Sequence, residues 1–137
     1  MSVLSRVLSG TEAVTDPDAE DARLRGRTYT IPFAQVWDAA LFLVDGGLAR
    51  WILVGSDDVK GVIDAERTTF FTRRVSDVRI DVGLDHNGQT RVDVHARSRG
   101  ERGDLGANAR AIGVLLRRMD KHLQAGPAHV LDAAGGS

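Results

Sequence analysis

The chain of 137 residues contains no cysteine. This absence excludes disulfide bonds, thiolate metal sites and a cysteine nucleophile. The charge has no dominant sign, because 18 basic residues face 19 acidic ones, so no overall field attracts nucleic acid. The longest mainly apolar run, around residues 39–44, is far shorter than the roughly 20 residues that cross a bilayer. We therefore expect a soluble, cytoplasmic protein with no signal peptide, no transmembrane segment and no nucleic-acid partner.

Sequence motifs of the common catalytic and cofactor-binding classes are also missing. The glycine clusters lack the lysine or serine context of a phosphate-binding loop, a dinucleotide fingerprint or a nucleophile elbow. The four histidines are scattered without the spacing of a zinc site. The sequence thus predicts no metal and no cofactor, and gives no positive indication of catalysis.

Both ends of the chain differ from its centre. Residues 1–26 have no sustained periodicity, contain the turn signal Asp16-Pro17-Asp18 and carry an uncompensated acidic stretch. Gly126-Pro127 ends whatever precedes it, and the last residues are small and polar. With 42% hydrophobic residues, the chain can bury a core of ordinary size. We expect a flexible N-terminal arm (1–26), a single domain (27–124) and a C-terminal tail (125–137).

The centre alternates between strand and helix patterns. Residues 27–31 alternate as a short strand, and residues 33–44 carry an apolar helical stripe that Gly46-Gly47 ends. A hairpin follows over residues 51–66, with its turn at Asp57-Asp58 and with Val59, Gly61, Ile63 and Ala65 on one side of the second strand. The aromatic residues of these segments are expected mainly in the core.

Two longer strands, near residues 77–84 and 91–97, alternate apolar and charged side chains. A three-residue loop with Gly88 in the left-handed conformation pairs Asp85 with Gln89 and Val82 with Val92, so that the apolar sides coincide. The same register sets Asp77 opposite Arg97 and Arg79 opposite His95.

A final helix is expected after Gly103, with Asp104 as its N-cap and an apolar stripe through Leu116 and Leu123. The predicted fold class is therefore α+β, with the order strand, helix, about four strands, helix. An antiparallel sheet with both helices packed on one face satisfies this pattern.

Residues 96–110, ARSRGERGDLGANAR, together with residues 76–79 on the preceding strand, resemble the signature of the domain of unknown function 1499 family. The first helix, the strand with Trp51 and residues 61–67 fit the same pattern, so the resemblance covers about residues 27–123. The arginine-rich stretch 99–102 departs from the usual pattern of the family. The family has no established activity, so the resemblance implies a fold and no reaction.

Charged residues of the two long strands form the first candidate site. Asp77, Arg79, His95 and Arg97 are expected on the solvent-facing side of the sheet, where arginine could hold a carboxylate or phosphate in bidentate geometry. The alternative is a cross-strand ion pair between Asp77 and Arg97 with no ligand. The single strand histidine also fits an ordinary surface position.

The start of the last helix forms the second candidate site. Its backbone amides could receive an anion, assisted by Arg99, Arg102 and Arg110. In the architectural interpretation Asp104 caps the helix and Asn108 ties the loop to the sheet.

Two functions remain open from the sequence. The first is a non-catalytic binding or protein-interaction domain, such as an accessory subunit of a larger assembly, that uses the N-terminal arm or the sheet face. An exposed apolar patch or an ordered arm would distinguish it. The second is a small-molecule carrier or an enzyme with a pocket between the sheet and the C-terminal helix, marked by an enclosed cavity of roughly 300 Å³ or more.

Overall fold

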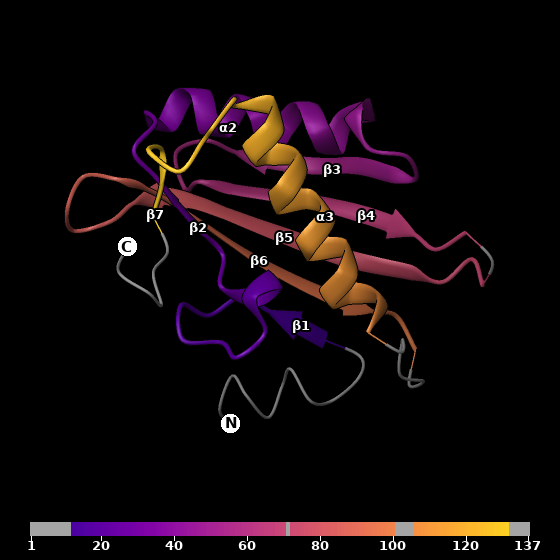
Figure 1. Cartoon of the computed structure of the whole chain (residues 1–137). Helices are drawn as coiled ribbons and strands as arrows, with labels where there is room; N and C mark the ends of the chain where they lie inside the picture. The colour runs from indigo at the N-terminus through magenta and orange to yellow at the C-terminus, as the bar shows by residue number, and fades with distance from the viewer. Residues whose placement is uncertain (1–11, 71, 101–105, 132–137) are drawn as a thin grey trace.

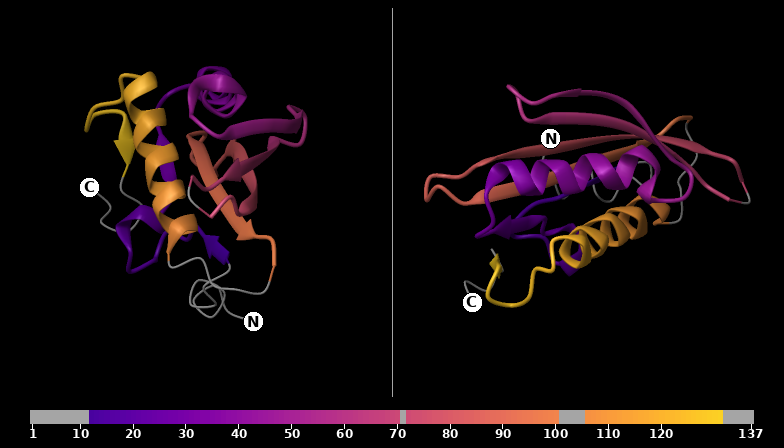
Figure 2. Two further views of the ribbon diagram at one scale, coloured as in Figure 1. Left: turned by 90° about the vertical axis from the view of Figure 1, so that its right-hand side faces the viewer. Right: turned by 90° about the horizontal axis from the view of Figure 1, so that it is seen from above.

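The computed structural model describes residues 12–70, 72–100 and 106–131. One antiparallel sheet carries two helices on the same face, as Figures 1 and 2 show. The predicted α+β class is confirmed, although the sheet has seven strands, more than the sequence predicted. Its order is β3-β4-β5-β6-β2-β7, and β1 pairs with β6 beside β2. The elements are β1 (Glu12–Val14), η1 (Ala22–Leu24), β2 (Arg27–Tyr29), α2 (Phe33–Phe42), η2 (Leu43–Gly47), β3 (Trp51–Asp57), β4 (Val62–Thr68), β5 (Val75–Leu84), β6 (Thr90–Ser98), α3 (Ala107–His122) and β7 (Val130–Leu131).

The hairpin of β5 and β6 forms the centre of the sheet, in the register that the sequence predicted. Val82 lies opposite Val92, and the Asp85 amide donates to the Gln89 carbonyl at 2.8 Å. Gly88 has φ +76°, a conformation in which a side chain would be strained. This register buries the inward apolar residues of both strands except Leu84, which is 65% exposed beside the turn, so burial and turn geometry select the same pairing.

Both helices present an apolar stripe to the sheet. Val36 of α2 and Ile112 of α3 are completely buried. Gly106, with φ +81°, occupies the N-cap position of α3. Asp104, the residue predicted to cap this helix, lies outside the described residues. Among the helices that the structure describes, none has the length and apolarity needed to span a bilayer.

Residues 12–26 do not form an arm outside the core. β1 pairs with β6 in antiparallel register, and Ala13 and Leu24 are buried with the other core residues. Thr15 continues the attachment, because its amide donates to the Val94 carbonyl at 3.0 Å. The sequence pattern could not predict the pairing of β1, because a three-residue strand buries a single side chain and shows no alternation.

Two smaller predictions also need correction. Val130 and Leu131, expected in the tail, form β7 and pair with β2. Val59, expected on the buried side of a strand, lies in the turn between β3 and β4 and is 93% exposed. The strand begins only at Val62, because Gly61 turns the chain with φ +72°.

Candidate functional site

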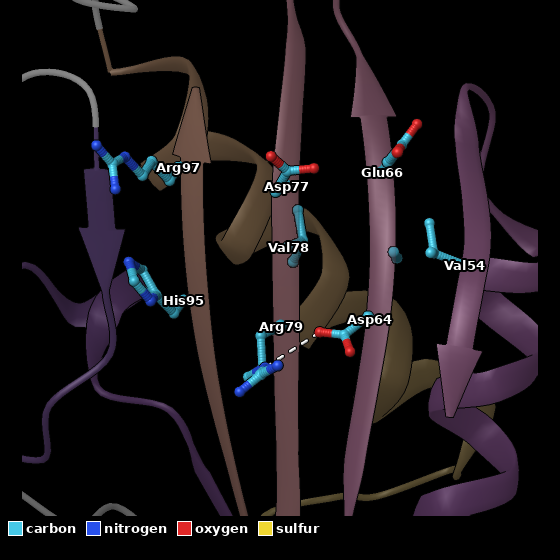
Figure 3. Close-up of a pocket in the computed structure, with 9 residues that line it drawn as sticks. Val54, Asp64, Glu66, Asp77, Val78, Arg79, His95 and Arg97 are labelled. Atoms are coloured by element: carbon cyan, nitrogen blue, oxygen red, sulfur yellow. Dashed lines mark hydrogen bonds and ion pairs between the residues drawn. The ribbon is translucent and has the colours of Figure 1, made fainter. Parts of the chain in front are cut away.

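The face of the sheet opposite the helices, here called the open face, carries most of the predicted site residues. Along β5 and β6 the buried and exposed side chains alternate, so that every second residue points to this face. Asp77 and Arg79 point outward from β5, and His95 and Arg97 do so from β6. Figure 3 shows these four side chains around one shallow depression. The sequence pattern alone therefore brings the first candidate set together.

The depression is an open hollow of about 440 Å³. Acidic side chains lie mainly on the β4 side and basic side chains on the β6 side, as Figure 3 shows. Apolar atoms of β3, β4 and β5 complete its lining. The lining residues are Val54, Asp64, Ala65, Glu66, Asp77, Val78, Arg79, His95 and Arg97.

Arg99 neutralises the acidic side of the hollow. Its guanidinium donates to both carboxylate oxygens of Asp77, at 2.7 and 3.1 Å, and to Glu66 at 2.8 Å. The hydrogen bonds from Arg99 lower the pKa of Asp77 below its usual range. Arg97 does lie opposite Asp77, as predicted, but the ion pair of Asp77 is made to Arg99.

Glu12 of β1 explains why Arg97 faces away from Asp77. The register places Glu12 opposite Arg97, and its carboxylate lies 3.7 Å from Arg97 Nε and 3.4 Å from His95 Nε2. β1 thus supplies an acidic partner on the outer side of β6. This residue was missed in the sequence, because the acidic stretch around it indicated a solvated arm.

The charges of the hollow nearly cancel. Arg79 Nε lies 3.1 Å from Asp64, which completes a set of cross-strand ion pairs. The acidic members are Glu12, Asp64, Glu66 and Asp77, and the basic members are Arg79, Arg97 and Arg99. Among these described residues, four carboxylates against three guanidiniums leave a formal charge of −1. This balance disfavours the predicted carboxylate or phosphate ligand, since the arginines are already neutralised.

Beyond this hollow, the open face continues toward the β5–β6 turn. Asp81 faces Asp93 across the strands, and burial, as the largest cause, raises the pKa of Asp81. Arg91 forms an ion pair with Asp93, in which Arg91 Nη2 lies 2.8 Å from Asp93 Oδ1. A further hollow of about 320 Å³ includes these three residues and Lys60. No group of metal-ligating side chains suitable for an ion occurs among the described residues.

The second candidate set lies on the helix side of the sheet. Asn108 is 1% exposed; its oxygen accepts from Ser76 at 2.8 Å, and its Nδ2 donates to Ser98 at 3.0 Å. These bonds join the first turn of α3 to β5 and β6, which fits the architectural interpretation. Arg110 is exposed on the outer side of the same turn. The structure therefore separates Asn108 and Arg110 from the charged hollow, while Arg99 joins it.

An exposed apolar strip borders the charged hollow on β3. Ile52 and Val54 are 61% and 60% exposed, and Val54 contributes to the hollow. β3 is an end strand of the sheet and pairs with β4 alone in the described part of the chain. The bulge between Leu53 and Gly55 brings an extra residue onto this strand. The continuous apolar run 51–54 predicted a strand, but it did not predict that Ile52 and Val54 face solvent.

The architecture is therefore an open antiparallel sheet with two helices on one face and a charged, partly apolar surface on the other. A family described as protein of unknown function (DUF1499) matches residues 5–119, and the chain belongs to this family. No curated protein and no solved structure matches the chain.

Proposed function

We propose that this chain is a non-catalytic protein-interaction domain that receives a partner on the β3 side of the open face. The exposed pair Ile52 and Val54 carries the proposal, because two large apolar side chains lie together on an end strand. Natural proteins usually protect such strands with lysine, proline or a covering segment. A surface of this kind is typical of partner binding.

The apolar side chains and the open edge of β3 favour one kind of partner. Burying Ile52 and Val54 stabilises a complex by roughly 1.5–3 kcal/mol each. A partner segment in extended conformation can also hydrogen-bond to the outer edge of β3. The neighbouring ion pairs then favour a partner with complementary polar groups, which adds specificity more than affinity. We infer an extended, apolar segment of another protein, followed by polar residues over the hollow.

A carrier or enzyme with a pocket between the sheet and the C-terminal helix is the alternative. The layer beneath α3 is occupied by Ile112, Leu115, Leu116 and Met119, all fully buried. The hollows described above open on the other face of the sheet. The interaction domain is therefore the function that the geometry supports better.

The test is isolation of the native complex from source cells, followed by hydrogen exchange on the purified assembly. We expect a stoichiometric partner that slows amide exchange along β3, because strand addition protects edge amides. Val54→Asp should abolish recovery of that partner. Val114→Asp is the matched control, because Val114 is an exposed valine on α3, on the opposite face.

Retention of the same partner by Val54→Asp, or its loss with both variants, would contradict the proposed surface. Unchanged exchange along β3 in the complex would contradict strand addition.

A further inference from the structure

The junction of α2 and α3 is a second surface feature, on the opposite layer of the molecule from the open face. In Figure 1 the C-terminal end of α3 reaches α2. Phe42, the last residue of α2, is 55% exposed, and its ring stacks on His122, the last residue of α3, with ring centres 4.8 Å apart. The backbone at Gly47 also lies close, since a Cβ there would be 3.1 Å from a ring carbon. The ring is therefore held in place while more than half of it faces solvent.

Charges of opposite sign surround this ring. α2 and η2 carry the exposed Asp38 and Asp45 and no cation. Asp38 precedes Phe42 by four residues, so the two side chains share one face of α2. On α3, Arg118 precedes His122 by the same interval. The exposed arginine and lysine residues of α3 are Arg110, Arg117, Arg118 and Lys121. The surface is thus acidic on α2 and basic on α3, with an aromatic ring between the two.

The charges at the junction are not paired within the described part of the molecule. Asp38, Arg118 and Lys121 take part in none of its salt bridges. The arginines around the charged hollow, in contrast, each hold a carboxylate. Asp120, the only acidic residue of α3, is engaged by Arg27 of β2. The junction therefore offers both kinds of charge to another molecule.

We propose that the α2–α3 junction, comprising Asp38, Phe42, Arg118 and Lys121, docks an amphipathic helix of another protein. An apolar residue of that helix covers the Phe42 ring, carboxylates lie over α3, and a basic residue lies over Asp38. A ring that is already fixed loses little conformational entropy when it becomes an anchor.

The mixture of charges favours a protein over a lipid bilayer or a nucleic acid. A surface of phosphates placed on the Phe42 ring would also meet Asp38 and Asp45, and such like-charge contacts oppose binding. A protein can place groups of both signs. A helix suits the site better than a strand, because the backbone groups of α2 and α3 are bonded within the helices and side chains alone are offered.

The inference does not depend on the proposed partner at β3, because other residues on the opposite face carry it. The test is Phe42→p-benzoylphenylalanine in the full chain, expressed in the source cells and irradiated. We expect a covalent adduct with one protein, through a segment with the acidic, amphipathic pattern of such a helix. Arg118→Glu and Lys121→Glu should each lower the adduct yield by about tenfold. Lys60→Glu is the matched control, because it makes the same charge change at an exposed lysine in the β3–β4 turn.

Val54→Asp should also leave the adduct unchanged, so failure of the β3 surface and failure of this surface are distinguishable. A synthetic peptide of the cross-linked segment then permits a charge exchange: Arg118→Glu should weaken its binding about tenfold, and lysine in place of the facing peptide carboxylate should restore it. Circular dichroism checks that each variant is folded. The inference is overturned by the absence of a protein adduct, by an adduct with lipid or nucleic acid alone, by a cross-linked segment without carboxylates, or by a yield that survives both charge reversals.

Discussion

Replacement of Asn108 by alanine should be among the most destabilising changes that remove only one polar group. The Asn108 side chain is buried, and it bonds Ser76 and Ser98 on two neighbouring strands. Asn108→Ala removes both bonds and leaves a small cavity at the start of α3. The effect tests whether this candidate site residue acts in architecture or in ligand binding.

The loss of stability depends on the two serine hydroxyls that stay buried after the substitution. Each serine hydroxyl loses a partner, and an unsatisfied buried group costs about 1–3 kcal/mol. The two hydroxyls still lie 3.3 Å apart and can bond one another, which offsets part of the loss. We therefore expect Asn108→Ala to lower the free energy of unfolding by about 2 kcal/mol, a large share of the 5–15 kcal/mol typical of a domain.

Urea denaturation followed by circular dichroism measures the change. Arg118→Ala is the control, because this exposed side chain lies on the same helix and should change stability by less than about 0.5 kcal/mol. The triple variant Ser76→Ala, Ser98→Ala, Asn108→Leu should recover part of the loss, because the three polar groups that bond one another are removed together. A loss below about 0.5 kcal/mol for Asn108→Ala would refute the reasoning.

Three further outcomes are expected. Gly61→Ala should destabilise the fold by at least about 2 kcal/mol in urea denaturation. The added Cβ would lie 2.1 Å from the Val82 carbonyl oxygen of β5, and Gly61 has φ +72°. An unchanged stability would contradict this close approach. Burial, followed by a hydrogen bond to a carboxylate, raises the pKa of Tyr29 far above its usual range. The neutral phenol therefore stabilises the fold below about pH 10, and the stability falls above that pH. The absorbance of Tyr29, the only tyrosine of the chain, should change only when the protein unfolds. Ionisation of Tyr29 near pH 10 in the folded protein would disprove this. In NMR titrations, Arg99→Ala should raise the pKa of Asp77 toward its usual range while Arg97→Ala should not; the reverse result would restore the pairing predicted from sequence.

The sequence predicted the centre of the fold because one physical cause dominates there. Burial of alternate residues and the left-handed glycine at position 88 both select the same pairing of β5 and β6. The gathering of Asp77, Arg79, His95 and Arg97 on the open face followed from that register without further information. The partner of Asp77 did not, because Arg99 reaches it from the end of β6, beyond the alternating strand pattern.

The edges of the sheet could not be predicted for a different reason. β1 and β7 have three and two residues, so neither shows a measurable period. Their places depend on long-range pairing, which a local pattern does not encode. The exposure of Ile52 and Val54 is a similar case, since only the strand order makes β3 an end strand.

The attachment of β1 has a consequence for the order of folding. Glu12 pairs with Arg97, a separation of 85 residues (97 − 12), whereas the neighbouring hairpin of β5 and β6 closes locally. Contacts of such separation form late and, in a short strand, open first. When β1 opens, the hollow loses the carboxylate of Glu12 and its formal charge changes from −1 to zero. The electrostatic character of the open face therefore depends on a short strand that docks late.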